Sequence, residues 1–146
     1  MTFGIQKLAK ALGDAGCYFF SILRIAELEG RLSHDPLYEA EIAMAEGTMG
    51  ADCFVRDAGR LLSSATRDQW TCLKAGPGHE LPLDYKLRPG EREILRFELF
   101  IAPDSPPLAH FVAGNGRNQA EWDPWPESRA VASGRLVSRR IFRKAT

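Results

Sequence analysis

The sequence has no long hydrophobic run, no excess charge of either sign and few cysteines. No stretch reaches the roughly 20 apolar residues that a transmembrane helix needs, and residues 1–10 lack the apolar core of a secretory signal. We therefore expect a cytoplasmic protein with no membrane partner. Basic and acidic residues number 19 each, so the net charge is zero, which argues against nucleic acid binding by bulk electrostatic attraction.

The chain contains only three cysteines, Cys17, Cys53 and Cys72. Their odd number and the lack of a C-x-x-C pair argue against a disulfide framework and a zinc ribbon, and a reducing compartment fits this usage. The length of 146 residues, with 45% hydrophobic and 26% charged content, is ordinary for a globular protein. We therefore expect a single domain over residues 1–146 with a sizeable core of its own.

The first part of the chain has helical patterning. Residues 17–29 are apolar around most of the helix circumference, which predicts a central, buried helix. Ser33 to Pro36 resembles a helix start, and Gly13 and Gly47 are stop signals. Helical spacing predicts three further segments, over residues 6–12, 37–45 and 57–65.

The second part of the chain has strand patterning, with hairpin signals at residues 114–118 and at Ser133-Gly134. Residues 75–89 are a Gly/Pro-rich connection with room for a short strand. Helices followed by antiparallel strands predict an α+β fold, with an N-terminal helical half whose central buried helix packs on a C-terminal antiparallel β-sheet. The expected strands cover residues 69–73, 92–101, 108–113, 119–122, 129–132 and 135–143.

Cys17 is the candidate nucleophile, because it follows Gly16 and opens the apolar helix. A helix N-terminus carries roughly half a positive charge, which favours thiolate over thiol. Most free cysteines are small apolar core residues, and we interpret Cys53 and Cys72 in this way. A distant histidine and aspartate make the catalytic interpretation of Cys17 the stronger one.

His110 is the candidate general base, since it lies near the start of an expected strand and an imidazole beside a thiol activates it. Asp123 ends the next expected strand and is the favoured residue to orient the imidazole. Its Asp-Pro sequence is also typical of a simple turn. The rival orienting residues are Glu121, Asn115 and Asn118.

Gln6 is a weaker candidate, as a side-chain donor to an oxyanion beside the backbone N–H of Cys17. The basic residues that follow Glu127 are open to two interpretations, an anionic docking face or the solvated face of an edge strand. We favour the second, because positive charge discourages edge pairing. These residues are Arg129, Arg135, Arg139, Arg140, Arg143 and Lys144.

Three segments carry a resemblance to papain-like cysteine peptidases, namely residues 16–21, His110-Phe111-Val112-x-Gly114 and Trp122-Asp123-Pro124. The chain most resembles the small bacterial branch that includes bacteriocin leader-processing peptidases, although Tyr18 stands where those have glycine. Its tail, from Ser128 to Ile141, is similar to that of proteins carried by phages and plasmids. The resemblance implies a site between a helical half and a sheet half, with Cys17 as nucleophile, His110 as base and Asp123 as orienting residue.

The favoured hypothesis is therefore a thiol hydrolase that cleaves an amide or isopeptide bond of a peptide or protein substrate. This chemistry needs no metal and no organic cofactor. The alternative from another class is a non-catalytic phage accessory or protein-interaction module on the same scaffold. A third hypothesis is peptidoglycan amide cleavage by the same triad.

Overall fold

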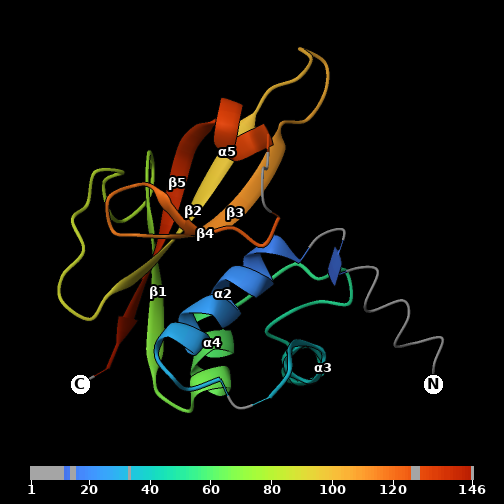
Figure 1. The fold of residues 1–146 in the computed structure, drawn as a ribbon, viewed down its shortest axis with the longest axis vertical. Helices are drawn as coiled ribbons and strands as arrows, with labels where there is room; N and C mark the ends of the chain where they lie inside the picture. Colours follow the sequence, from blue (N-terminus) through green and yellow to red (C-terminus); the bar gives the residue numbers. More distant parts are fainter. Residues whose placement is uncertain (1–11, 14–15, 33, 126–128, 146) are drawn as a thin grey trace.

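A computed structural model of the chain describes residues 12–13, 16–32, 34–125 and 129–145. Helices precede strands, apart from one short helix before the last strand (Figure 1). The elements are α2 (Cys17–Leu28), α3 (Pro36–Glu46), α4 (Ala58–Thr66), β1 (Trp70–Ala75), β2 (Arg92–Leu99), β3 (Leu108–Gly114), β4 (Ala120–Trp122), α5 (Arg129–Ser133) and β5 (Arg135–Lys144).

The five strands form one sheet in the order β1-β5-β2-β3-β4, and every neighbouring pair is antiparallel. The predicted α+β class and antiparallel sheet are confirmed. β5, the last strand in the chain, lies between β1 and β2, so it is hydrogen-bonded on both sides. The strand that carries His110 is β3, which pairs with β2 on one side and with the short β4 on the other.

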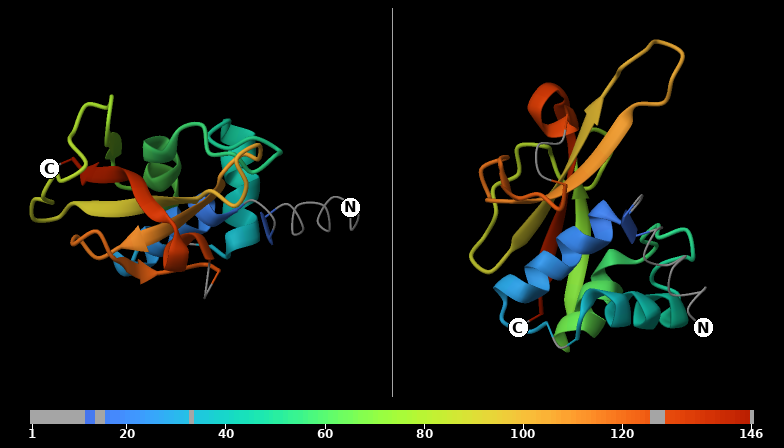
Figure 2. Two further views of the ribbon diagram at one scale, coloured as in Figure 1. Left: turned by 90° about the horizontal axis from the view of Figure 1, so that it is seen from above. Right: turned by 45° about the vertical axis from the view of Figure 1, so that its right-hand side comes forward.

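Helix α2 crosses the sheet and packs mainly against β3, as the views in Figure 2 show. Phe19, Ile22 and Ala26 are fully buried, because the helix has the sheet on one side and α4 on another. The predicted central helix is therefore present, and it starts at Cys17 as expected. Its burial fixes the position of its first residue.

Helices α3 and α4 begin at aspartate caps. The Asp35 carboxylate accepts the Tyr38 N–H at 3.1 Å, and the Asp57 carboxylate accepts the Arg60 N–H at 3.1 Å. The chain leaves α3 through Gly47, whose φ of 77° is left-handed. Both helices agree with the predicted segments, and α4 packs against both α2 and β1.

The main core lies between α2, α4 and one region of the sheet, and it includes Phe19, Leu62, Trp70, Ile94 and Phe142. A smaller cluster packs α5 against the sheet through Leu95, Phe97, Val112 and Ala130. None of the described helices is both long and apolar enough to cross a lipid bilayer.

The predicted hairpin around Ser133-Gly134 is wrong. Residues 129–133 form α5, and Ala130 is fully buried in the smaller cluster. A Cβ on Gly134 would lie 2.3 Å from the Ala130 carbonyl oxygen and 2.5 Å from the Glu98 carbonyl oxygen. The glycine thus marks a tight exit from a helix rather than a turn between strands. The connection over residues 75–89 forms no strand beyond Ala75, the last residue of β1. It has an isolated β-bridge between Ala75 and Leu81.

The interpretation of the basic C-terminus as an edge strand is also wrong. β5 has a strand on each side, and Arg139 is only 1% exposed. Its guanidinium Nε donates to the Glu93 carboxylate of β2 at 2.9 Å. The Arg143 guanidinium binds the Glu91 carboxylate in the same way. Arg139 and Arg143 of β5 are therefore neutralised by acidic residues more than forty positions earlier, Arg139 in the interior and Arg143 at the surface.

Candidate functional site

Cys17 is the first residue of α2, and its side chain is partly exposed. Gly16 is the N-cap residue, and none of the described side chains caps the helix. A Cβ on Gly16 would lie 2.4 Å from the carbonyl oxygen of Leu12, so the close approach of these backbones requires glycine. The thiol therefore sits at a helix N-terminus, where the helix dipole favours an anion.

His110 and Asp123 come from adjacent parts of the sheet. His110 is the third residue of β3 and is only 4% exposed, while Asp123 directly follows β4. The His110 Nε2 atom lies 2.6 Å from Asp123 Oδ1. The same carboxylate oxygen accepts the backbone N–H of Trp125 at 2.8 Å. Two hydrogen bonds thus hold the carboxylate against the imidazole.

Two of the three rival orienting residues, Glu121 and Asn115, are engaged elsewhere. Glu121 Oε1 accepts a hydrogen bond from Arg24 Nη2 at 2.8 Å. The Asn115 side chain bonds to Gln119 and to backbone N–H groups of its own loop, and Asn118 occupies a left-handed loop position with φ of 62°. Asp123 is the described carboxylate that contacts His110.

The His110 imidazole lies between Asp123 and Cys17. Burial alone would lower the pKa of His110, but hydrogen bonds with Cys17 and Asp123 outweigh that effect and raise the pKa above its usual value. Because Asp123 occupies Nε2, Nδ1 is the ring nitrogen left for the thiol. The arrangement favours the imidazolium form of His110.

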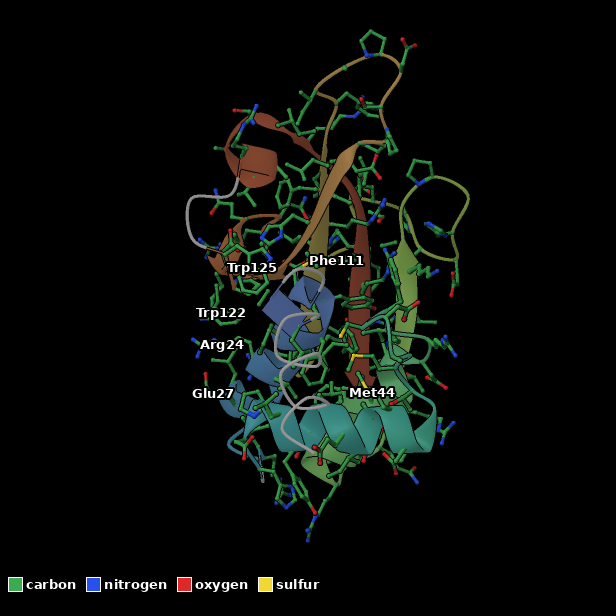
Figure 3. All side chains as sticks on the ribbon, turned by 90° about the vertical axis from the view of Figure 1, so that its right-hand side faces the viewer. Arg24, Glu27, Met44, Phe111, Trp122 and Trp125 are labelled. Carbon is green, nitrogen blue, oxygen red and sulfur yellow. The ribbon has the colours of Figure 1, made fainter. Side chains whose placement is uncertain are left out.

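The N-terminal end of α2 is fixed to β3 at the residue next to His110. The Tyr18 ring stacks on the Phe111 ring with centroids 4.3 Å apart and planes 9° apart. The Ser21 hydroxyl donates to the Phe111 carbonyl oxygen at 3.3 Å. Figure 3 shows Phe111 beside the N-terminal end of α2. These contacts fix the start of α2, which carries Cys17, against the part of β3 that carries His110.

A second set of contacts fixes α2 to the segment that carries Asp123. Arg24 binds Glu121 of β4, and its guanidinium lies 5.9 Å from the ring centroid of Trp122. The Phe20 and Trp125 rings meet edge to face at 5.8 Å. Figure 3 shows Arg24, Trp122 and Trp125 along the same side of α2. Helix α2 therefore begins with Cys17 and also contacts β3, which carries His110, and β4, which directly precedes Asp123.

Cys17 and His110 line a cleft of about 1340 Å³. One wall is formed by residues 53–60, which cover the loop before α4 and its first turn, and the opposite wall includes residues of β1, β2, β3 and β5. A volume of this size accommodates a ligand larger than a single amino acid. The nucleophile candidate is thus accessible, while Asp123 lies behind the imidazole.

Cys53 and Cys72 differ from Cys17 in their surroundings, although both also border the cleft. Cys53 is 1% exposed, and burial raises the pKa of its thiol. Burial raises the pKa of Cys72 to about 11. Burial therefore makes both thiols weaker nucleophiles than an ordinary cysteine at neutral pH. Gln6 lies outside the described residues.

Two residues beside the site were missed at the sequence level, Tyr18 and Arg140. Tyr18 follows Cys17 directly and stacks on Phe111 of β3. Its place in the first turn of the expected helix, next to Cys17, was the signal that could have identified it. Arg140 reaches the cleft from β5. It was obscured because the basic run was assigned to an exposed edge.

Within the described part of the chain, no three His, Cys, Asp or Glu side chains converge closely enough to hold a metal ion. Comparison with known proteins found no matching family model, no matching curated protein and no matching solved structure. The assignment of a function therefore rests on the residues themselves.

Proposed function

We propose that this protein is a papain-like thiol hydrolase that cleaves an amide or isopeptide bond in a peptide or protein substrate. The observation that carries the proposal is the His110 Nε2 to Asp123 Oδ1 contact of 2.6 Å, in an imidazole that also interacts with Cys17. Cysteine, histidine and a carboxylate in this order form an activated nucleophile with a fixed tautomer.

In the first half of the reaction, the Cys17 thiolate attacks the carbonyl carbon of the scissile bond. The positive end of α2, including the Cys17 N–H, stabilises the developing oxyanion. The bond between carbon and nitrogen then breaks, and the amine leaves with the proton carried by His110. A thioester between Cys17 and the acyl part of the substrate remains.

In the second half, neutral His110 removes a proton from water, and the resulting hydroxide attacks the thioester carbonyl. The bond between carbon and sulfur breaks, the acid leaves, and the thiolate and imidazolium are restored. Asp123 holds the imidazole in one orientation throughout and stabilises its charged form. Every proton is accounted for by His110 and water.

The papain-like assignment is supported by the arrangement of the elements. The nucleophile opens a central helix, the histidine lies on an antiparallel strand packed against that helix, and the carboxylate follows the neighbouring strand. The cleft lies between the sheet on one side and the loop before α4 with the start of that helix on the other.

The proposal is tested with p-nitrophenyl acetate, an activated ester that reports on thiol acylation without knowledge of the natural substrate. The wild-type protein is expected to release p-nitrophenolate with repeated turnover. Cys17→Ala is expected to abolish the release, whereas Cys72→Ala, a change of the same chemistry in the same cleft, retains it. Mass spectrometry should detect the acetyl group on Cys17.

Turnover that survives in Cys17→Ala would contradict the mechanism. Acylation at Cys53 or Cys72 in preference to Cys17 would do the same. A Cys17 that accepts no acyl group would favour the alternative of a non-catalytic interaction module.

A further inference from the structure

We infer that Arg140 binds a carboxylate group of the substrate within the cleft that holds Cys17. This inference rests on the proposed function, and it adds the chemical class that the site selects. An arginine guanidinium is the side chain best suited to a carboxylate, because its N–H groups match the two carboxylate oxygens.

Arg140 borders the cleft and interacts with Tyr18, the residue that follows the candidate nucleophile Cys17. Its guanidinium lies 5.5 Å from the centroid of the Phe111 ring, on which Tyr18 stacks. Nη1 donates to the Ser138 hydroxyl at 2.8 Å, so the side chain is held in place. Its Nε is buried and has no hydrogen-bond partner among the described residues. The guanidinium is thus positioned and incompletely satisfied.

No described carboxylate neutralises Arg140 through an ion pair. This sets it apart from Arg139 and Arg143 in the same strand, which bind Glu93 and Glu91. It also differs from Arg96 on the neighbouring strand, which binds Glu98. A partly buried cation without an anionic partner is unfavourable, and an anionic ligand would compensate it.

The side chains nearest to Arg140 do not supply the missing negative charge. Arg140 interacts with the Tyr18 hydroxyl and with the Cys72 thiol. Burial raises the pKa of Tyr18 far above its usual value, and burial raises the pKa of Cys72 to about 11. Both groups are therefore neutral at physiological pH, and the Arg140 charge persists in the cleft.

The wider cleft has the same electrostatic bias. The described lining contains more cations than anions, namely Arg56, Arg60, Lys74, Arg96 and Arg140 against Asp57 and Glu80. Arg96 is paired with Glu98, and the other four cations still outnumber the two carboxylates. The protein as a whole has no net charge. The positive potential is therefore a local property of the cleft, which attracts anionic substrates.

The carboxylate has two sources in a peptide, an acidic side chain or the free C-terminus. Both sources present the same group to Arg140. In either case, we expect Cys17 to react faster with an anionic reagent than with a neutral reagent of the same chemistry. Iodoacetate and iodoacetamide are a suitable pair of probes, because they alkylate thiols by the same chemistry and differ in charge. The quantity to measure is the ratio of their rates at Cys17, obtained by peptide mapping.

In wild-type protein, the ratio of iodoacetate to iodoacetamide rates at Cys17 is expected to exceed that of free cysteine. Arg140→Gln is expected to lower the ratio about tenfold, the loss of one charge-assisted hydrogen bond. Arg140→Lys, which retains the charge, should keep most of the preference. Arg135→Gln removes an exposed charge from the same strand outside the cleft, and it should leave the ratio unchanged.

A ratio unaffected by Arg140→Gln, or lowered equally by Arg135→Gln, would overturn the inference and leave the proposed function standing. A Cys17 inert to both reagents would instead overturn the proposed function. Circular dichroism establishes that each variant is folded. If Arg140→Gln does not fold, Lys74→Gln provides the second test, because Lys74 is exposed on the same wall and should lower the ratio by a smaller factor.

Two small ligands then distinguish the sources of the carboxylate. N-acetylaspartate α-amide carries only a side-chain carboxylate, and N-acetylglycine carries only a terminal one. The ligand that protects Cys17 more strongly from iodoacetamide identifies the source, and the protection should vanish in Arg140→Gln. Protection that is equal in wild type and Arg140→Gln would contradict a role for Arg140.

Discussion

Two polar clusters in this protein have opposite surroundings. The pair of Glu93 and Arg139 lies inside the fold, with side chains 0% and 1% exposed. The Arg139 guanidinium donates to Glu93 and to the carbonyl oxygens of Leu83 and Tyr85, and Glu93 also accepts the Gly116 N–H at 2.6 Å. The cluster of Cys17, His110 and Asp123 instead opens on one side to the cleft.

The difference separates a cluster that stabilises the fold from one that the proposed function can use. In the buried pair, other protein groups satisfy the guanidinium and the carboxylate, so little capacity to bind a ligand remains. In the site cluster, protein contacts fix His110 from the Asp123 side, while the thiol side faces the cleft. A polar cluster that is fixed from behind and open in front is suited to chemistry.

The largest expected effect comes from breaking the buried pair. Glu93→Gln leaves the Arg139 charge without its partner, and we expect the free energy of unfolding to fall by about 3–5 kcal/mol. Urea denaturation measures the loss. The matched control is Glu27→Gln, because Glu27 forms an ion pair with Arg24 but is 59% exposed, and its loss should cost less than about 1 kcal/mol.

The buried pair also predicts the behaviour of a double variant. Replacing both partners, as in Glu93→Leu with Arg139→Met, should be less destabilising than Glu93→Gln alone, since no uncompensated charge remains. A double variant with the sum of two independent losses would contradict this account. The Cys17 alkylation rate of folded protein should be unchanged in each of these variants.

The second prediction breaks the other cluster. His110→Gln removes the base while its amide can still donate to Asp123, so we expect Cys17 alkylation near neutral pH to slow by about 100-fold. The free energy of unfolding should change by about 1 kcal/mol. His79→Gln is the control, because His79 is exposed in a loop and does not border the cleft. Equal rates in wild type and His110→Gln would remove His110 from the mechanism.

The contrast between the clusters also explains what the sequence could predict of the fold. Apolar residues around α2 and the candidate cap at Asp35 are local signals, and each agrees with the structure. The cap at Asp57 was not predicted, because the expected helix over residues 57–65 began at that residue. The charges of β5 were misjudged because their partners, Glu93 on β2 and Glu91 just before it, are distant in sequence. Local pattern cannot distinguish a basic residue paired across a sheet from one in solvent.

The site was predictable to the extent that its residues stand in recognisable contexts. Cys17 at a helix start and Asp123 after the strand next to His110 are such contexts, and the structure brings these side chains together. Arg140 was not predictable, because its importance depends on the lack of an ion-pair partner among the described residues. That property exists only once the strands are paired.

The third prediction concerns pH. The folded protein raises the pKa of His110 above its unfolded value, which is about 6.5. The imidazolium therefore stabilises the folded state fully below about pH 6.5, and the contribution disappears as the pH rises through the folded pKa. We expect the free energy of unfolding of wild type to exceed that of His110→Gln by a larger margin at about pH 6 than at about pH 9. Urea denaturation at both pH values measures it, and the opposite slope would contradict an imidazolium held by Cys17 and Asp123.

The smallest expected effect tests how the site cluster is held from behind. Arg24 connects α2 to Glu121 of β4, the strand that ends next to Asp123. Arg24→Gln should weaken this connection, with a stability loss of about 0.5–1 kcal/mol because the pair is partly exposed. Asp123 would then hold His110 less firmly, so Cys17 alkylation should slow by about threefold, far less than in His110→Gln. Glu27→Gln removes the other carboxylate partner of Arg24 without touching β4, and it should leave the alkylation rate unchanged. If both variants had the same rate, the connection to β4 would be a surface ion pair with no influence on the site.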